Sequence, residues 1–309
     1  MLNFTKMKLH KRLKPTEASY LGLQVLPKDG DRNPRYYVTL EQWENVLRYR
    51  EDKDVKVLFY DIETSPALSF VWGAGWGKNI PYDNIIEDWK IICISYSWGD
   101  NDKVHRLEWD NDKTTRCDKS LVEEFVKILN QADMIVAHNG DKFDIKKIRT
   151  RAVYHNIPMR PMYKSYDTLK KARQHFKFDS NKLDSIAKML GVGAKLHHTG
   201  FQMWADCYYG DEDAMRLMGE YCDMDIIVLR DVYNALRHYS RHNIHRGAIL
   251  GKPKYSCPHC GEDGELQLIR NECTKAGTIQ RIVLGECGHE YKISNSEYMK
   301  YLKSKINLI

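Results

Sequence analysis

Residues 56–64 read KVLFYDIET, and this stretch decides how the rest of the chain can be arranged. The apolar run at 57–60 predicts a buried strand. Asp61 and Glu63 follow two positions apart, so both project from the same face of the sheet. An unpaired charge beside such a run is costly. We therefore expect these two carboxylates to have a cation as their partner.

The segments that follow predict a mixed α/β domain. Strands at 91–98 and 104–109 would complete a meander with the first strand. Beyond them the patterns predict a helix at 121–130, a strand at 134–137, a helix at 143–155, a short strand near Tyr166, helices at 168–176 and 181–190, and a long helix at 212–237. Three strands followed by alternating helices and strands imply a mixed sheet with helices on its faces.

Composition places the chain among folded globular proteins. Of its 309 residues, 42% are hydrophobic and 29% are charged, which argues against disorder and low complexity. No stretch approaches the ~20 apolar residues of a membrane span, and the first residues lack the apolar core of a signal peptide. We expect a cytoplasmic protein with no membrane partner.

Charge is distributed unevenly along the chain. The net charge is +3 over residues 1–54, −2 over 55–236 and +5 over 237–309. Basic flanks around an acidic centre suit a carboxylate metal site that acts on a polyanion, although solvated charge without a partner gives the same totals. The predicted organisation is an N-terminal accessory segment (1–54) with a helix capped by Thr39 and Gln42, a central α/β domain (55–237), a basic linker (238–253) and a cysteine-rich domain (254–309).

Two further motifs add acidic residues to the pair on the first strand. HNGDKFD (138–144) puts Asp144 at a helix start just beyond a strand, where it could bind a ligand or interact with the helix dipole. In EYCDMDIIVL (220–229), Tyr221 and Asp225 share the apolar face of a helix, whereas Asp223 is expected in solvent. The four carboxylates of Asp61, Glu63, Asp144 and Asp225 form a hard oxygen-ligand set suited to Mg²⁺ or Mn²⁺.

The ordered triple DIET, HN-x3-FD and Y-x3-D resembles the three motifs of the DEDD 3′→5′ exonucleases, the DnaQ-like branch of the ribonuclease-H-like superfamily. A tyrosine four positions before the last aspartate is typical of the tyrosine subclass. The histidine subclass would have a histidine five positions before Asp225, where this chain has Glu220. The resemblance covers about residues 55–237, and the pair Asp167-Thr168 also fits. The chain resembles, more loosely, stand-alone exonucleases common in bacteriophage genomes, and a phage origin would place it in the host cytoplasm.

This resemblance implies a ribonuclease-H-like fold and two-metal hydrolysis of phosphodiester bonds. Asp61, Glu63 and Asp225 would hold the ion that activates the attacking water, and Asp61 with Asp144 would hold the second. Tyr221 would orient the water by hydrogen bonding; its alternative role is that of a core aromatic residue with a satisfied hydroxyl.

Contacts to the substrate are predicted from residue type. Trp72 and Trp76 follow the first motif and could stack on terminal bases of single-stranded or duplex-end nucleic acid, or pack beneath their loop. Asn139 and Lys142 could bind the strand, and further lysines and arginines of 146–151 could meet phosphates or form a solvated face.

The C-terminal cysteines predict a zinc site. SCPHCG (256–261) and ECGHEY (286–291) resemble the two knuckles of a zinc ribbon, although Leu284 stands where a cysteine is expected. With a turn at 274–277, Cys273 would pair near Thr278 and lie about 30 Å from the knuckles. The expected ligands are therefore Cys257, Cys260, Cys287 and His289, with Cys273 as the alternative fourth ligand. Absence of any metal is the remaining alternative.

The sequence as a whole predicts a metal-dependent 3′→5′ exonuclease, with DNA favoured as substrate, two Mg²⁺ or Mn²⁺ ions and one Zn²⁺ ion. Replication or recombination proteins are possible partners. An exoribonuclease is the nearest alternative, since the same core serves both polymers. A catalytically inactive nucleic-acid-binding scaffold is the alternative from another class.

Overall fold

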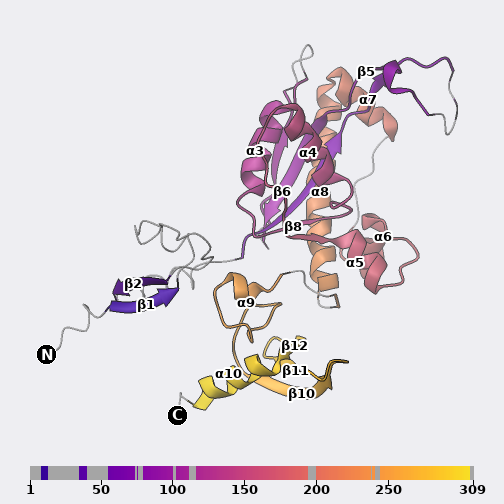
Figure 1. Ribbon diagram of the computed structural model, residues 1–309. Coiled ribbons are helices and arrows are strands. Elements are labelled where there is room, and N and C mark those ends of the chain that lie inside the picture. Colours follow the sequence, from indigo (N-terminus) through magenta and orange to yellow (C-terminus); the bar gives the residue numbers. More distant parts are fainter. Residues whose placement is uncertain are drawn as a thin grey trace.

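A computed structural model describes residues 8–12, 35–39, 55–73, 75, 79–99, 102–110, 116–193, 200–237, 239–240 and 244–306 (Figure 1). Near the N-terminus, strands β1 (Lys8–Arg12) and β2 (Arg35–Thr39) pair antiparallel. These two strands were not predicted from the sequence. The helix that it placed after Thr39 lies outside the described residues.

The largest sheet has five strands in the order β7-β6-β3-β8-β9. Their bounds are β3 Val57–Thr64, β6 Ile91–Trp98, β7 His105–Glu108, β8 Met134–Ala137 and β9 Ser165–Asp167. The β7-β6-β3 meander is antiparallel, and β8 and β9 add in parallel. The predicted mixed sheet is confirmed, with β3 at its centre.

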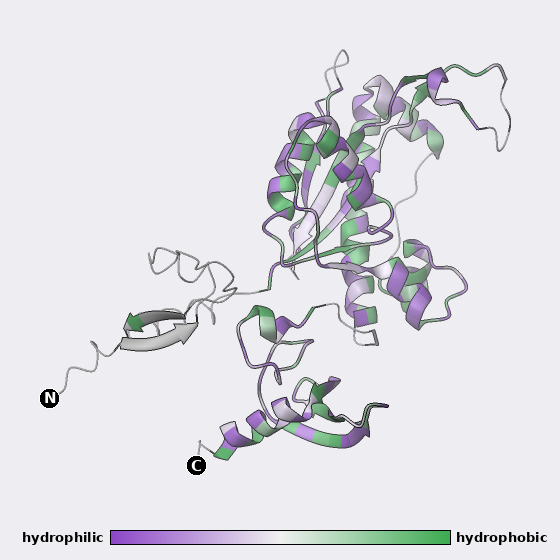
Figure 2. Cartoon of the chain, viewed as in Figure 1, coloured by the Kyte–Doolittle hydropathy of each residue, from purple (hydrophilic) through white to green (hydrophobic). Residues whose placement is uncertain are grey.

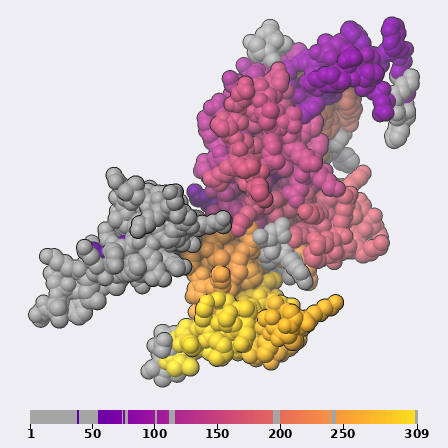
Figure 3. Space-filling model, in the orientation of Figure 1, coloured from indigo at the N-terminus to yellow at the C-terminus, as the bar shows by residue number. Residues whose placement is uncertain are grey.

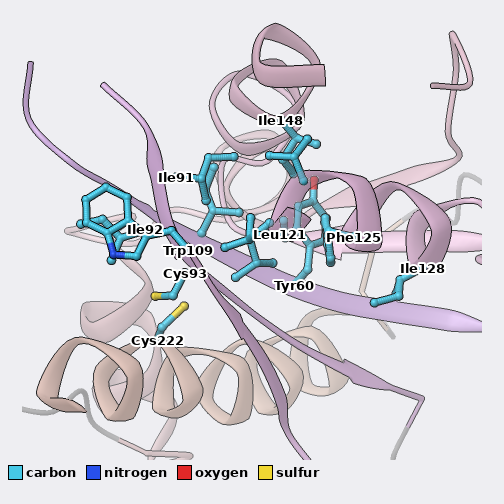
Figure 4. Packing of buried hydrophobic residues seen from close by; sticks show 14 of the residues in the cluster. Tyr60, Ile91, Ile92, Cys93, Trp109, Leu121, Phe125, Ile128, Ile148 and Cys222 are labelled. Atoms are coloured by element: carbon cyan, nitrogen blue, oxygen red, sulfur yellow. The ribbon is translucent and has the colours of Figure 1, made fainter. Parts of the chain in front are cut away.

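Helices cover both faces of this sheet. On one side lie α3 (Lys119–Leu129) and α4 (Asp144–Tyr154), and on the other the long α8 (Glu212–Arg237) (Figure 1). Successive β3 side chains alternate between the two sides: Tyr60 packs on Phe125 of α3, with ring centroids 5.5 Å apart, and Phe59 packs on Tyr233 of α8 at 5.2 Å. Figure 4 shows the same division, with Leu121 and Phe125 across the strands from Cys222 of α8.

The remaining helices of this domain are α5 (Thr168–His175), α6 (Leu183–Leu190) and α7 (Phe201–Tyr209). Those at 168–175 and 183–190 were predicted, and α7 was not. Along α8, hydrophobic and hydrophilic residues alternate in bands (Figure 2), as expected for a helix with one face on a sheet. No helix in the described ranges has both the length and the apolarity to span a bilayer.

Helix α8 fits closely against β6 and β7 because position 219 is glycine. A Cβ at Gly219 would lie 1.6 Å from Nη1 of Arg106, so the guanidinium occupies the space of the missing side chain. Asp223 pairs with that guanidinium at 3.6 Å and accepts a hydrogen bond from the Ser95 hydroxyl at 2.5 Å. Asp223 was expected in solvent; its side chain is 33% exposed, and its contacts with Arg106 and Ser95 also tie α8 to the sheet.

The Gly- and Trp-rich segment after β3 is a projecting arm, where the sequence analysis expected only a loop (Figure 3). It contains β4 (Leu68–Ser69), a 3₁₀ turn η2 (Tyr82–Asn84) and β5 (Ile85–Glu87). Its base is held by reciprocal hydrogen bonds between Ser65 and Lys90. Several large apolar side chains on it are exposed, among them Phe70 and Trp72.

The C-terminal part is an antiparallel three-stranded sheet of β10 (Leu266–Cys273), β11 (Ile279–Gly285) and β12 (Glu290–Ser294), preceded by the short α9 (Arg246–Ile249) and followed by α10 (Asn295–Ile306). The predicted turn at 274–277 is confirmed, with Gly277 at φ 78°. Near the knuckles Leu266 pairs with Gly285, in the predicted register. A bulge after Leu268 shifts the pairs near the turn by one residue, so Cys273 lies opposite Ile279.

A buried ionic cluster joins the start of β6 to two helices. Asp118, fully buried, accepts hydrogen bonds from Nε and Nη2 of Arg151 at 2.7 and 2.6 Å, and from the backbone of Ile91 at 3.0 Å. The His155 ring lies 2.7 Å from the same carboxylate. Burial acts to raise the pKa of Asp118, but the hydrogen bonds from Arg151, Ile91 and His155 outweigh it and hold the pKa below its usual value.

We predict that Asp118→Ala lowers the free energy of unfolding by about 3–5 kcal/mol at pH 7, because it leaves the buried Arg151 without its carboxylate. Urea unfolding measures the loss. The control is Glu123→Ala, which removes an exposed pair with Lys127 and should cost no more than about 0.5 kcal/mol.

The pH dependence of the free energy of unfolding tests whether the Asp118 carboxylate causes this stability difference. A carboxyl with a depressed folded-state pKa stabilises the fold above its unfolded pKa of about 3.9, and this contribution is lost as pH falls toward the folded value. The stability difference between the unsubstituted chain and Asp118→Ala should therefore shrink as pH falls below about 4. A difference that grows on acidification would contradict the account.

Candidate metal and nucleic-acid site

Three carboxylates meet where β3 crosses α8. Asp61 and Glu63 continue the row of Val57 and Phe59, so they face the same helix. One oxygen each from Asp61, Glu63 and Asp225 lies within 4.8 Å of the others. Asp225 is only 3% exposed, while the other two are half-buried. The strand period of two and the helix face of α8 thus bring together residues more than 160 positions apart.

The surroundings of this group come from α7 and α8. The indole Nε1 of Trp204, on α7, donates a hydrogen bond to Oε2 of Glu63 at 3.1 Å. The Cys222 thiol lies 3.7 Å from the carbonyl oxygen of Asp61. Tyr221 is buried, and its ring meets that of Trp204 edge-on with centroids 6.3 Å apart.

Asp144, the first residue of α4, lies beside this group but is not part of the triplet whose oxygens are all within 4.8 Å. Strand β3 pairs with β8 only as far as Phe59, so its edge is open beyond that point, and the backbone amide of Ile62 donates to the Asp144 carboxylate. Burial raises the pKa of Asp144 to about 7, and the nearby Glu63 and Asp167 raise it too, against the hydrogen bonds from backbone amides.

The turn before Asp144 is tightly fixed. Asn139 has a positive φ of 71°, and a Cβ at Gly140 would lie 2.5 Å from the Cβ of Ala137. The buried Asp167 accepts hydrogen bonds from the backbone amides of Asn139 at 3.0 Å and Asp141 at 3.2 Å. Asp167, the first residue of the Asp167-Thr168 pair noted in the sequence, therefore holds the loop that positions Asp144.

A cleft of about 550 Å³ opens beside this turn. Asn139 and Lys142, both predicted as substrate contacts, lie in its wall. The other residues lining it are Asp141, Asp167, Leu169, Lys170, Arg173 and Gln174. Lys170 and Arg173 were not predicted, because α5 also carries Lys171 and nothing in the sequence marks which of its basic residues line a cleft.

The two predicted stacking residues are Trp72 and Trp76. Trp72 lies on the arm with its side chain completely exposed, so it does not pack beneath the loop. Trp76 lies outside the described residues.

The C-terminal cysteines form a second group. Sulfur atoms of Cys257, Cys260 and Cys287 lie within 4.8 Å of one another, and the Sγ atoms of Cys257 and Cys287 are 3.5 Å apart. Burial and the neighbouring Cys287 raise the pKa of the Cys257 thiol to about 12. The backbone amide of His259 donates to its sulfur.

The fourth predicted ligand is less closely placed than the thiols. His289 is outside the triplet of sulfur atoms, and its ring stacks on that of His259, with centroids 5.1 Å apart. Cys273 lies at the far end of the β10–β11 hairpin, exposed to solvent. The structure thus brings three of the four predicted zinc ligands together and keeps Cys273 away.

The two donor sets suit different ions. Three clustered carboxylate oxygens are hard ligands of the kind that Mg²⁺ and Mn²⁺ prefer, and a cation would offset their mutual repulsion. Three thiols are soft ligands that match the tetrahedral sites of Zn²⁺. The residues present fit both groups of ions.

A family model that matches part of the chain agrees with the fold. Residues 86–237 match the family model described as the RNase_H superfamily; this range includes Asp144, Tyr221 and Asp225 and begins after β3. No curated protein matches. Among solved structures, a family B DNA polymerase from the hyperthermophilic archaeon Pyrobaculum calidifontis has a TM-score of 0.48 and 16% identity. The similarity covers 60% of this chain and 25% of the polymerase chain. Residues 86–237 are thus similar to the RNase_H superfamily, and the mixed sheet flanked by helices is consistent with an RNase H-like fold.

Proposed function

We propose that this chain is a metal-dependent 3′→5′ exonuclease that hydrolyses phosphodiester bonds at nucleic-acid 3′ ends, with DNA as the favoured substrate. The observation that carries the proposal is the convergence of Asp61, Glu63 and Asp225 within 4.8 Å. Two Mg²⁺ or Mn²⁺ ions held by these residues and Asp144 would activate the attacking water and stabilise the leaving oxygen.

The chain's own residues then have separate tasks. Tyr221, one helical turn from Asp225 on α8, orients the attacking water by hydrogen bonding. The cleft beside Asn139 and Lys142 receives the strand, and its cations Lys170 and Arg173 offer contacts for phosphates. Trp72 offers an exposed ring for stacking on a base.

We further propose a division of the chain at the predicted boundaries. Residues 55–237 carry the chemistry, and residues 254–309 bind one Zn²⁺ through Cys257, Cys260, Cys287 and His289. The zinc-binding part and the basic linker 238–253 would increase the affinity for nucleic acid. Residues 1–54 remain an accessory segment.

The direct test is digestion of end-labelled single- and double-stranded DNA and RNA with Mg²⁺ or Mn²⁺. A 5′-labelled strand should shorten in single-nucleotide steps, while a 3′ label is released at once as mononucleotide. RNA cleaved faster than DNA would favour the exoribonuclease. Binding without hydrolysis of any substrate would favour the inactive scaffold and contradict the proposal.

Asp61→Asn and Asp225→Asn should each reduce the rate at least about 100-fold, because each removes a carboxylate ligand of the metal. Even the loss of a residue that only hydrogen-bonds to a metal ligand typically lowers activity about 10–100-fold. Substrate binding, measured by anisotropy in EDTA, should remain. Asp223→Asn is the matched control on the same helix, expected to stay within about threefold of the unsubstituted rate. Equal losses in all three variants would show damage to α8 and not to the metal site.

Tyr221→Phe should lower kcat by about 10–1,000-fold while Mn²⁺ binding stays unchanged, because orientation of the water is lost and the carboxylates remain. Single-turnover rates measure the effect. An unchanged rate would leave Tyr221 as a core aromatic residue.

Metal analysis of the purified chain should find about one zinc per molecule. Cys257→Ser and Cys287→Ser should release it, since thiolate ligands hold the ion and couple it to local folding. Cys273→Ser is the control that should keep the zinc. Retention in His289→Ala together with loss in His259→Ala would move the fourth ligand to His259. A chain that contains no zinc would refute the site.

A further inference from the structure

We infer that Trp204 is a positioning residue of the candidate metal site, whose indole N–H holds the Glu63 carboxylate in the orientation that binds the ion. The inference rests on the proposed function only in taking Asp61, Glu63 and Asp225 as metal ligands. Its starting observation is the hydrogen bond from Nε1 of Trp204 to Oε2 of Glu63, 3.1 Å long and joining residues 141 positions apart.

Glu63 needs such a support more than its neighbours do. It lies near the end of β3, where the ladder with β6 shifts register between Glu63 and Thr64. Glutamate has one more rotatable bond than aspartate, so more freedom must be lost before its oxygen can bind a metal. Asp225, by contrast, is held inside the packed face of α8.

The indole group suits this task chemically. It is a neutral donor with no acceptor, so it cannot compete for the cation. Its single N–H engages Oε2 of Glu63 and so restrains the orientation of the whole carboxylate. Residues that hydrogen-bond to metal ligands fix ligand orientation in this way, and their loss typically weakens metal binding about 10–100-fold.

Helix α7 is anchored firmly enough to transmit this orientation. Met203 and Cys207 are buried in the core that also contains Tyr221 and Cys222. Four residues after Trp204, the Tyr208 hydroxyl donates to Glu87 at the base of the arm. Residues four apart share a helix face, so one face of α7 holds two glutamates, of which only Glu63 belongs to the metal site.

A second contact links Trp204 to the reaction. Its ring meets Tyr221 edge-on at 6.3 Å, so the indole lies against both a candidate ligand and the side chain proposed to orient water. Replacement of the indole would therefore disturb the metal site first and the tyrosine second.

Mn²⁺ binding to the full-length chain, followed by electron paramagnetic resonance, tests the inference without requiring catalysis. Trp204→Phe keeps an aromatic ring but removes the donor, and should weaken Mn²⁺ binding about 10–100-fold. Tyr208→Phe is the matched control, because it removes a hydrogen bond from the same helix face to a glutamate outside the site. It should bind Mn²⁺ within about twofold of the unsubstituted chain.

Met203→Ala separates orientation from packing. It loosens α7 while keeping the indole donor, and should weaken Mn²⁺ binding less than Trp204→Phe does. Unchanged binding in Trp204→Phe would overturn the inference, and so would an equal loss in Met203→Ala.

A measurement on the native tryptophan covers the case in which Trp204→Phe does not fold. In ¹⁵N-labelled chain, one indole N–H resonance should move when Mg²⁺ is added, and the same resonance should move in Glu63→Gln. Glu87→Gln, the corresponding change at the other end of α7, should leave it in place. If no indole resonance responds to Mg²⁺ or to Glu63→Gln, the inference is wrong.

These outcomes separate the inference from the proposed function. A chain that binds Mn²⁺ through Trp204-supported Glu63 but hydrolyses no nucleic acid would refute the exonuclease and keep the positioning role. An active exonuclease whose Mn²⁺ affinity is unchanged in Trp204→Phe would keep the proposed function and refute the positioning role.

Discussion

The packing of β3 against α8 is the contact on which the candidate site depends. Because strand side chains alternate, the residues that follow Phe59 on the α8 side must be Asp61 and Glu63. The apolar contact between Phe59 and Tyr233 holds β3 against α8. Asp61 and Glu63, on the same side of the strand, therefore lie next to Asp225. A shift of one residue in strand register would turn both carboxylates to the opposite face of the sheet. Apolar burial along this contact therefore contributes the free energy that holds the three carboxyl groups together.

Much of this arrangement could be predicted from local patterns. Strand 134–137 and helix 212–237 were predicted at their observed bounds, because one is a short apolar run and the other has a long apolar stripe. The pairing of Leu266 with Gly285 followed from placing the turn at 274–277. Such features depend on residues close in sequence, or on one turn whose position fixes all the pairs after it.

Other features depend on contacts that no local pattern carries. Helix α7 was missed, although Gly200 and Gly210 bracket it and Met203 and Cys207 have helical spacing. Its contact with Glu63 spans 141 positions and could not be read from either segment. Asp223 was expected in solvent because its helix position points away from the apolar stripe. Arg106, lying across Gly219, covers that side of α8 and gives Asp223 a partner.

The central claim, that β3 and α8 build a site for hard divalent cations, is tested most directly by anomalous diffraction from crystals grown with Mn²⁺. The account predicts manganese within about 2.0–2.3 Å of oxygens from Asp61, Glu63 and Asp225, near the distances of hard-cation sites. A separate zinc signal should lie at Cys257, Cys260 and Cys287. Crystals whose manganese lies elsewhere, with the three carboxylates free of metal, would contradict the account.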